Sequence, residues 1–244
     1  MVLIARYDAD NAKTEIGVDE VGRGPMFGRV YCAAVILPND KTKFKHELMK
    51  DSKKFTSKKK IEEVAEYIKA NCVAYSVGYV DERVIDEINI KNATHKAMHI
   101  AVKNIIKYDD DNLLLIDGSN FTPITYLQDA ITIVPSRAKG TWLQLPLASI
   151  KSDALKEVPF VCIIGGDNKY SAIAAASIIA KVERDKYIYE LCDKYPKLDE
   201  YYDLRNNKGY GTAKHMEGIK KYGITEWHRK SFGICKEMVK TNSM

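Results

Sequence analysis

The sequence predicts an α/β fold in which helices cover a sheet, followed by a helical lobe at the C-terminal end. Short apolar runs typical of strands alternate with longer stretches that carry apolar residues at helical spacing. After Cys192 only helical and loop patterns follow. The chain has 244 residues, of which 45% are hydrophobic, so it is long enough to bury one sizeable core.

Five strands are expected from period-2 alternation or from short apolar runs bounded by turn residues. They lie near Glu15–Asp19, Val30–Leu37, Val73–Val80, Leu113–Asp117 and Phe160–Ile164. The segment Ile124–Val158 follows neither pattern clearly. Within it we expect a short strand at Ile131–Val134 and a helical turn at Ser149–Leu155.

Four helices are expected between and after these strands. The first is capped by Thr56 or Ser57 and runs through Lys69, with its apolar side chains on one face. The others are Asn92–Ile106, the long alanine-rich stretch Ser171–Cys192, and Thr212–Tyr222, which Thr212 caps and Gly223 ends. We therefore divide the chain into residues 1–192 and a helical lobe, residues 193–244, that belongs to the same unit.

Composition and charge narrow the class of protein. Lysine and arginine number 38 and aspartate and glutamate 33, which gives a formal net charge of +5. This mild excess suits a polyanionic partner, but many proteins that bind no nucleic acid share it. The five cysteines form no CxxC pair, so we expect free thiols in a reducing compartment. No run approaches the roughly 20 apolar residues of a membrane helix, and we expect a soluble cytoplasmic protein with no membrane partner.

Four acidic residues stand where predicted strands end. Asp19 and Glu20 close the first strand, and Asp117 closes a strongly apolar one. Asp167 follows another strand, just before the alanine-rich helix. Because ligand sites in α/β sheets gather at the carboxyl ends of strands, these four side chains are expected to converge. Mg²⁺ or Mn²⁺, which prefer oxygen ligands, would relieve their mutual repulsion, and two such ions support hydrolysis of a phosphodiester.

An ordinary structural role is the alternative for these carboxylates. An aspartate at a strand end is more often a turn former or a helix cap, and position alone favours that interpretation. A geometric condition also applies. Neighbouring residues in a strand point to opposite faces, so Asp19 and Glu20 reach one metal cluster only if Glu20 lies past the regular strand.

The motifs favour the metal-binding role of these carboxylates over the structural one. Several blocks resemble ribonuclease HII, in the order in which that family has them. Gly17–Pro25 (GVDEVGRGP) is similar to its opening signature, and Asp51–Lys54 is similar to its DSK segment. Leu115–Gly118 resembles its central aspartate strand, and Gly166–Asp185 its fourth-carboxylate helix. Lys208–Thr212 (KGYGT) and His228–Phe232 (HRKSF) resemble its C-terminal blocks. Together the blocks span nearly the whole chain.

The resemblance implies a ribonuclease H-like mixed sheet flanked by helices, with the catalytic domain in residues 1–192. It implies an endonuclease that hydrolyses the RNA strand of RNA/DNA hybrids and cuts on the 5′ side of ribonucleotides embedded in DNA, leaving 5′-phosphate and 3′-hydroxyl ends. Asp19, Glu20, Asp117 and Asp167 would hold two divalent ions, Mg²⁺ or Mn²⁺. Asp19 would bridge the two ions. Asp167 would bind the ion on the side of the attacking water, and Glu20 and Asp117 would bind the ion on the side of the leaving group. The expected partners are an RNA/DNA hybrid and ribonucleotide-containing duplex DNA, bound by a monomer.

Substrate contacts also follow from the resemblance. Gly22, Arg23 and Gly24 would approach the ribose through backbone groups, and Tyr210 would sense the 2′-hydroxyl at an RNA–DNA junction. Lys53 would contact a phosphate. Without the KGYGT context, Tyr210 would be an ordinary packed aromatic.

Other polar residues have a structural alternative. Lys58–Lys60 either contact the phosphates of the substrate or form the solvent-exposed first turn of a helix, and we favour the helix turn. His215 and His228 are assigned structural roles, because a two-metal site needs no histidine as a base. Arg184 and Asp185 are likewise assigned to structure.

The sequence departs from the family pattern in three places. Phe27 and Arg29 stand where a small residue and a proline are usual. Gly165, two residues before Asp167, stands where a lysine is usual. The span between the last two carboxylates is also longer than expected, with the extra residues in roughly Tyr126–Glu157. This insertion is either a substrate-contacting loop or a surface excursion, and we favour the excursion.

Three other functions are weighed. Ribonuclease HIII resembles this family but usually carries an extra N-terminal binding domain, whereas here the first strand begins near residue 15 and Arg23 lies in a GRG rather than a GTG context. A non-catalytic hybrid-binding protein is disfavoured because all four carboxylates are present. A generic phosphate-binding protein is disfavoured because the chain has no GxxxxGKS or GxxxxGKT loop.

Overall fold

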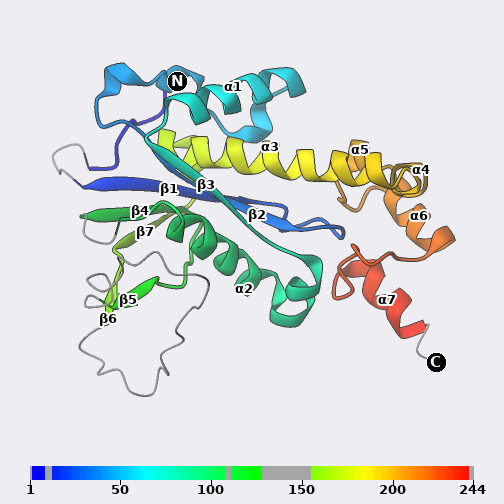
Figure 1. The fold of residues 1–244 in the computed structure, drawn as a ribbon. Helices are drawn as coiled ribbons and strands as arrows, with labels where there is room; N and C mark the ends of the chain where they lie inside the picture. The colour runs from blue at the N-terminus through cyan, green and yellow to red at the C-terminus, as the bar shows by residue number, and fades with distance from the viewer. Residues whose placement is uncertain (1, 9–12, 108–110, 128–154, 242–244) are drawn as a thin grey trace, which may run out of the picture.

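In a computed structural model the chain folds around one five-stranded sheet with helices on both faces (Figure 1). The structure describes residues 2–8, 13–107, 111–127 and 155–241. The strands of the sheet are β1 Thr14–Val21, β2 Val30–Ile36, β3 Ala74–Val80, β4 Asn112–Asp117 and β7 Phe160–Ile163. Their order is β3-β2-β1-β4-β7. β1, β4 and β7 are parallel, and β1, β2 and β3 are antiparallel neighbours, so the sheet is mixed, as predicted.

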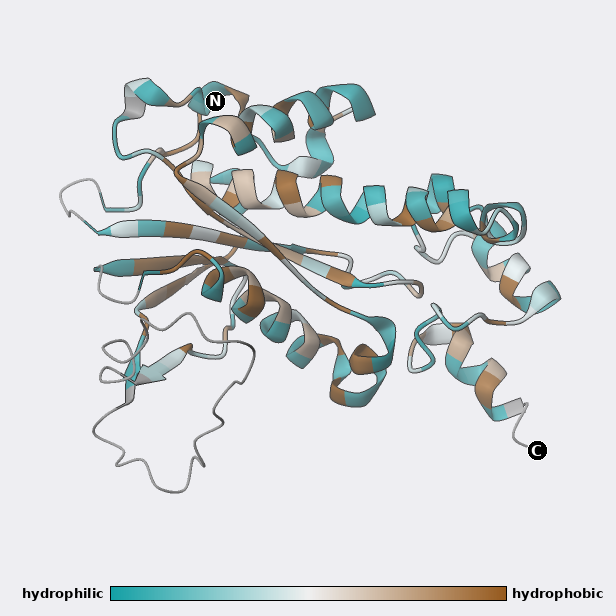
Figure 2. Ribbon diagram, viewed as in Figure 1, coloured by the Kyte–Doolittle hydropathy of each residue, from teal (hydrophilic) through white to brown (hydrophobic). Residues whose placement is uncertain are grey.

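Helices cover both faces of the sheet because its central strands are apolar on both. The large helices are α1 Lys58–Asn71, α2 Glu82–Lys103 and α3 Ser171–Lys194. In β2, Ala33 and Val35 pack in a cluster with α1 and α3, whereas Cys32 and Ala34 pack in a cluster with α2. Figure 1 shows α1 and α3 on one side of the sheet and α2 on the other. Figure 2 shows hydrophobic residues along the strands and hydrophilic residues on the outer turns of the helices.

The alanine-rich helix α3 lies very close to β1. A methyl group at Gly17 would lie 2.2 Å from the carbonyl carbon of Ala172, so only glycine fits there. The adjoining side chains of α3, Ala174 and Ala175, are fully buried. This close approach fixes the N-terminal end of α3, and with it the segment that carries Asp167, against β1.

The C-terminal lobe is helical, as predicted. Its described helices are α4 Lys197–Tyr202, α5 Leu204–Asn207, α6 Ala213–Tyr222 and α7 Gly233–Thr241. Leu198, Tyr202 and Ile219 of this lobe share a core with Phe27, in the β1–β2 connection, and with Tyr31 of β2. The predicted boundary after residue 192 falls inside α3, and the division at that point stays a prediction.

The five predicted strands and three of the four predicted helices are confirmed within two residues at each end. The fourth helix, expected at Asn92–Ile106, is the second half of α2, which begins at Glu82 and is broken at Asn89, where φ is +67°. The Asn89 side chain accepts a hydrogen bond from the backbone N–H of Asn92 and so caps the second half. The helical periodicity does not cross this break, which is why it predicts only the second half.

A two-stranded ribbon, β5 (Thr125–Leu127) with β6 (Leu155–Glu157), lies at the base of the insertion and is not predicted from the sequence. The helical turn expected at Ser149–Leu155 is wrong at its last residue, where β6 begins. The rest of that turn and the strand expected at Ile131–Val134 lie outside the described residues.

All five cysteines are free, as predicted, and Cys32, Cys192 and Cys235 are buried. Among the described residues, none of the helices combines the length and the apolar character needed to cross a membrane.

Candidate active site

The carboxyl ends of β1, β4 and β7 meet at one edge of the sheet. β1 and β4 are in parallel register up to the residue before Asp19, so Asp19 and Asp117 follow at neighbouring strand ends. Asp117 pairs in turn with Ile163, the last residue of β7. After β7 the chain enters a short 3-10 helix, η7 (Gly166–Asn168), which carries Asp167. The structure therefore brings the predicted strand-end carboxylates to one edge.

Asp19 is buried beneath α3, with 4% of its surface exposed. Its Oδ1 atom accepts a hydrogen bond of 2.6 Å from the backbone N–H of Glu20, and the hydroxyl of Ser177 in α3 bonds to the same side chain. Burial raises the pKa of Asp19 well above its ordinary value, and the charges of Glu20 and Asp117 raise it further. This carboxylate is therefore costly to ionise unless a cation is close.

Glu20 lies within β1, where it pairs with Cys32 of β2, so the geometric condition that it lie past the regular strand is not met with respect to β2. The β1–β4 pairing ends before Asp19, however, so both carboxylates extend beyond the end of that ladder. Asp19 faces α3, whereas Glu20 lines a cleft on the α2 side together with Asp117. The alternation of the strand is thus kept, and the two side chains approach the edge from opposite faces.

The electrostatic surroundings of Glu20 link it to Asp117. Burial raises the pKa of Glu20, the Arg23 guanidinium at 3.4 Å acts to lower it, and Asp117 acts to raise it, with a raised pKa as the net result. Glu20 therefore responds to Asp117 although its side chain leaves the strand on the other side from Asp19.

Asp117, at the end of β4, and Asp167 are connected through the turn that follows β7. Asp117 Oδ1 accepts a hydrogen bond of 2.6 Å from the backbone N–H of Gly166. Asp167 is 5% exposed, and burial raises its pKa. The charges of Asp117 and Asp51 raise the pKa of Asp167 further, while Lys53 acts in the opposite direction. Asp167 is thus another buried carboxylate that a nearby cation would stabilise.

Lys53 brings a positive charge to this edge. It lies in the 3-10 helix η3 (Ser52–Lys54), where Asp51 caps the turn by accepting a hydrogen bond of 2.9 Å from the backbone N–H of Lys53. Partial desolvation acts to lower the pKa of its ammonium group, but nearby carboxylates outweigh this effect and raise the pKa. In decreasing order of effect they are Asp51, Asp167, Asp19 and Asp117. Lys53 therefore faces the carboxylate edge, whereas Lys58–Lys60 form the exposed first turn of α1.

The Gly22-Arg23-Gly24 loop leaves β1 directly after Val21. Gly22 has φ +91°, and a methyl group there would lie 2.3 Å from the Nε atom of Arg184, so glycine is required by both conformation and space. The fully buried Arg229 donates hydrogen bonds of 2.6 to 3.0 Å to four carbonyl oxygens of the loop and of the chain that follows it. These belong to Gly22, Arg23, Pro25 and Gly28. The carbonyl groups of Gly22 and Arg23 thus point inward, toward Arg229.

Tyr210 lies beside this loop although it comes from the C-terminal lobe. A methyl group on Gly24 would lie 3.4 Å from the Cε1 atom of Tyr210. Next to it, the carbonyl oxygen of Gly209 accepts a hydrogen bond of 2.8 Å from the backbone N–H of Met26. Tyr210 is 46% exposed, so much of its ring faces solvent. The structure therefore brings the GRG and KGYGT blocks into contact.

Two groups of polar residues at this site are not predicted from the sequence. Lys91, Thr94 and His95 of α2 line the cleft of about 150 Å³ on the α2 side of the edge. Ser177 contacts Asp19 from α3. A hydroxyl within the buried, alanine-rich part of α3 is the signal that indicates Ser177, although Ser171 at the start of that helix shows the same signal. The α2 residues show no such contrast with their neighbours.

The donor set suits divalent cations. No three acidic, histidine or cysteine side chains in the described part of the chain are gathered as closely as in a preformed metal cage. The predicted ligands are all carboxylates, however, and these are the oxygen donors that Mg²⁺ and Mn²⁺ prefer. Asp19, Glu20 and Asp167 have pKa values raised by burial and by neighbouring negative charge, which a bound cation would reverse. By donor chemistry and electrostatics the residues fit the ions.

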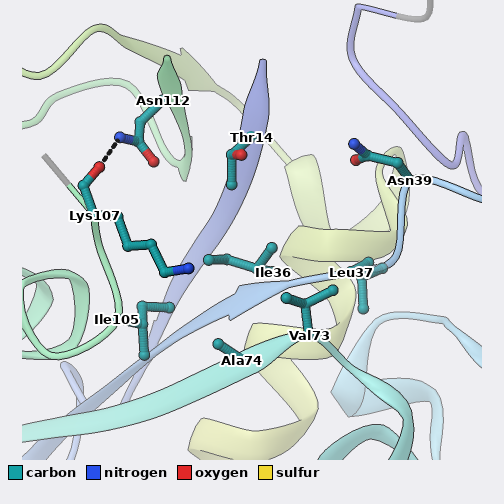
Figure 3. Close-up of a pocket in the computed structure, with 9 residues that line it drawn as sticks. All are labelled: Thr14, Ile36, Leu37, Asn39, Val73, Ala74, Ile105, Lys107 and Asn112. Carbon is teal, nitrogen blue, oxygen red and sulfur yellow. Dashed lines mark hydrogen bonds between the residues drawn. The ribbon is translucent and has the colours of Figure 1, made fainter. Parts of the chain in front are cut away.

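A separate pocket lies at the opposite end of the sheet (Figure 3). Its lining includes Thr14, Ala74 and Asn112, at the amino ends of β1, β3 and β4, and Ile36, at the carboxyl end of β2. None of the four carboxylates lines it. This pocket is therefore distinct from the predicted site.

Comparison with known proteins connects these features to one family. A sequence model of the ribonuclease HII family matches residues 16–235. The curated ribonuclease HII of Caldicellulosiruptor bescii is 41% identical to this chain over 216 residues, which cover 88% of this chain and 84% of that protein.

Solved structures share the fold. The ribonuclease H2 from Pyrococcus horikoshii matches with a TM-score of 0.66 and 22% identity, covering 93% of this chain and 98% of that one. Bst-RNase HIII in complex with Mn²⁺ matches with a TM-score of 0.54 and 18% identity, covering 95% of this chain but 70% of that one. The mixed sheet and its flanking helices are thus an arrangement found in both proteins.

Proposed function

This chain belongs to the ribonuclease HII family and is a ribonuclease H, and we propose that it hydrolyses the RNA strand of RNA/DNA hybrids at the edge formed by its four carboxylates. The proposed substrates include duplex DNA with single embedded ribonucleotides. These would be cut on their 5′ side to leave 5′-phosphate and 3′-hydroxyl ends. The observation that carries the proposal is that Asp19, Glu20, Asp117 and Asp167 come from three chain segments and act on one another at the carboxyl edge of one sheet.

We propose that these four carboxylates hold two divalent cations, Mg²⁺ or Mn²⁺. When bound, such ions lower the pKa of a water molecule and stabilise the charge on the leaving oxygen of a phosphodiester. The contribution of the chain is to orient the ligands through fixed hydrogen bonds, from Ser177 to Asp19 and from Gly166 to Asp117. Bst-RNase HIII, which shares the fold, has been solved with Mn²⁺.

The Gly22-Arg23-Gly24 loop and Tyr210 are proposed to read the sugar. RNA differs from DNA by its 2′-hydroxyl, so discrimination requires a contact at the sugar edge. Arg229 holds the carbonyl oxygens of the loop, and Gly24 has no side chain, so the loop backbone can approach a sugar closely. Tyr210 presents an apolar ring and a hydroxyl beside that backbone.

Lys53 is proposed to contact a phosphate of the cleaved strand. Its ammonium group is exposed and lies within the electrostatic reach of Asp167, so it can bind a phosphate that enters the carboxylate edge. Gly165, two residues before Asp167, offers no side chain, and the ammonium group of Lys53 acts on that carboxylate. All of the proposed groups come from one chain, which supports catalysis by a monomer.

The test is cleavage of three duplexes: an RNA/DNA hybrid, a DNA duplex with one ribonucleotide, and all-DNA. We expect Mg²⁺-dependent cleavage of the first two only. Asp117→Asn should lower turnover by at least about 100-fold, because several kcal/mol of transition-state stabilisation depend on the cation. Asp111→Asn is the matched control, because Asp111 precedes the opposite end of β4 and is exposed.

Wild-type turnover by Asp117→Asn at saturating Mg²⁺ would show that the carboxylate assignment is wrong. A non-catalytic hybrid-binding protein is the other candidate. Binding of the hybrid without any Mg²⁺-dependent cleavage would favour it over the enzyme.

A further inference from the structure

His215 and His228 form a hydrogen-bonded pair in the core of the C-terminal lobe. Their Nε2 atoms lie 3.2 Å apart, and the two residues are 0% and 1% exposed. Phe27 and Tyr202 pack against the His228 ring, with centroid distances of 5.0 and 4.9 Å. Two apolar side chains would fill this space without the cost of burying polar atoms, so the nitrogen atoms need a specific reason to be there.

The two ends of the pair fix the position of each imidazole proton. The backbone N–H of Thr225 can only donate, and it donates to His228 Nδ1 at 2.9 Å, so the His228 proton is on Nε2. That N–H donates to His215 Nε2, which places the His215 proton on Nδ1. His215 Nδ1 then donates to the carbonyl oxygen of Tyr210 at 2.9 Å. The bonds run in one direction, from Thr225 to Tyr210, and they require both imidazoles to be neutral.

The surroundings keep both rings neutral. Burial lowers the pKa of His228 to about 3, and the neighbouring His215 contributes to this shift. Burial also lowers the pKa of His215, although its hydrogen bonds to the carbonyl oxygens of Tyr210 and Gly209 act in the other direction. Both shifts favour the neutral rings that the chain of hydrogen bonds requires.

The pair joins the two segments that are proposed to read the sugar. The backbone on either side of His228 forms two hydrogen bonds of 2.8 Å with the chain that follows the GRG loop. These run from Gly28 N–H to the oxygen of Trp227 and from Arg229 N–H to the oxygen of Met26. At the other end of the pair is the carbonyl of Tyr210, the residue whose ring contacts Gly24. The connection is therefore continuous from the loop, through the two histidines, to Tyr210.

We propose that His215 and His228 are positioning residues for Tyr210, because their pair holds the Tyr210 carbonyl at a fixed place relative to the Gly22-Arg23-Gly24 loop. This inference rests on the proposed role of Tyr210 in reading the ribose. Neither histidine touches the carboxylate edge, so loss of the pair changes the preference between substrates rather than the chemistry of cleavage.

Two substitutions of His215 separate this role from simple packing. The amide nitrogen of His215→Asn takes nearly the place of Nδ1, so this variant keeps the donor to the Tyr210 carbonyl. The amide of His215→Gln takes nearly the place of Nε2, so it keeps the contact with His228 and loses that donor. Both variants remove an aromatic ring of the same size and introduce the same functional group.

The measured quantity is the ratio of kcat/KM on a single embedded ribonucleotide to kcat/KM on a long RNA/DNA hybrid. His215→Gln should lower this ratio about 2- to 12-fold, the effect of one net hydrogen bond. His215→Asn should keep most of the wild-type ratio. Equal ratios in both variants would overturn the positioning role. Tyr210→Ala is measured in parallel: an unchanged ratio in that variant would reject the proposed role of Tyr210 itself.

A second measurement uses the wild-type protein, so it tests the inference even if a variant fails to fold. In the wild-type protein, ¹⁵N NMR of the imidazole rings at pH 7 should show His215 protonated on Nδ1 and His228 on Nε2, with both rings neutral. A His215 ring protonated on Nε2, or a charged ring at either position, would contradict the hydrogen-bond chain and so overturn the inference, whatever the role of Tyr210.

Discussion

The ring of Tyr210 lies against Gly24, at a distance where a methyl group on Gly24 would be 3.4 Å from the Cε1 atom. The two residues belong to segments at opposite ends of the sequence, and the fold places a partly exposed aromatic ring beside backbone that carries no side chain. A sugar bound here would meet both surfaces at once. Discrimination between ribose and deoxyribose should therefore depend on this contact more than on the carboxylates.

Substitution of Tyr210 should change the two activities unequally. Tyr210→Phe keeps the ring and loses one hydrogen bond, worth about 0.5–1.5 kcal/mol net, so cleavage at a single ribonucleotide should fall about 2- to 12-fold. In Tyr210→Ala, cleavage at a single ribonucleotide should fall further. A long hybrid should be less affected, because its other 2′-hydroxyl groups still position the strand. The measurement is kcat/KM on both substrates, and equal losses on the two would mean that Tyr210 is only structural.

Substitution of Asp19 should raise stability while it removes activity. Asp19→Asn eliminates a buried charge that Glu20 and Asp117 repel, so without metal the variant should melt at a higher temperature than the wild type, by about 2–4 °C for each kcal/mol gained. Mg²⁺ or Mn²⁺ should raise the wild-type Tm and reverse much of this difference. Thermal scans with EDTA and with excess metal test this. A variant less stable than the wild type in EDTA would contradict the repulsion argument.

Substitution of Lys53 should weaken the dependence of binding on salt. If Lys53 contacts a phosphate, Lys53→Gln should reduce the slope of log K against log salt by about 1. Lys59→Gln is the matched control, because Lys59 lies in the exposed first turn of α1, and its slope should match that of the wild type. Binding to duplexes of unrelated sequence should be similar throughout. An unchanged slope for Lys53→Gln would remove the phosphate contact from the proposal.

Acid should destabilise the protein through His228. Burial lowers the pKa of His228 from 6.5 to about 3, so below pH 6.5 the unfolded chain binds a proton that the folded chain excludes. Stability from this source is therefore lost progressively as the pH falls from 6.5 toward 3. Between pH 7 and pH 5 the loss should be about 2 kcal/mol.

Denaturant titrations of the wild type and of His228→Gln, which cannot be protonated in this range, isolate the contribution of His228. The raised pKa of Asp19 acts in the opposite direction and is common to both proteins. The wild type should lose about 2 kcal/mol more than the variant on going from pH 7 to pH 5. Parallel pH profiles would show that the pKa of His228 is the same in the folded and the unfolded protein.

Much of the fold follows from local sequence because the central strands are buried on both faces. β4 has no polar side chain between Asn112 and Asp117, and such a short apolar run bounded by polar residues indicates a strand without knowledge of its neighbours. The elements that the sequence does not predict depend on distant partners. β5 exists only through its pairing with β6, and the first half of α2 is hidden by the break at Asn89.

The candidate site likewise has some features that local sequence predicts and others that depend on distant partners. The position of Asp117 at a strand end is local, and its convergence with Asp167 follows from parallel strands. The place of Glu20 inside β1 does not follow, because it depends on the pairing with β2, which continues past the end of the β4 ladder. The link from His228 to Tyr210 is also beyond local reasoning, since the HRKSF motif does not reveal which atoms its ring will meet.

The order of the site residues along the chain has a consequence for synthesis. Every carboxylate of the edge precedes α3, whereas Tyr210, His228 and Arg229 all follow that helix. A ribosome therefore completes the strands that carry the acidic groups well before it adds the residues that hold the GRG loop and the tyrosine ring. Until the C-terminal lobe docks onto Phe27, a nascent chain has the groups proposed to cut, but it lacks Tyr210 and the Arg229 side chain that holds the GRG loop.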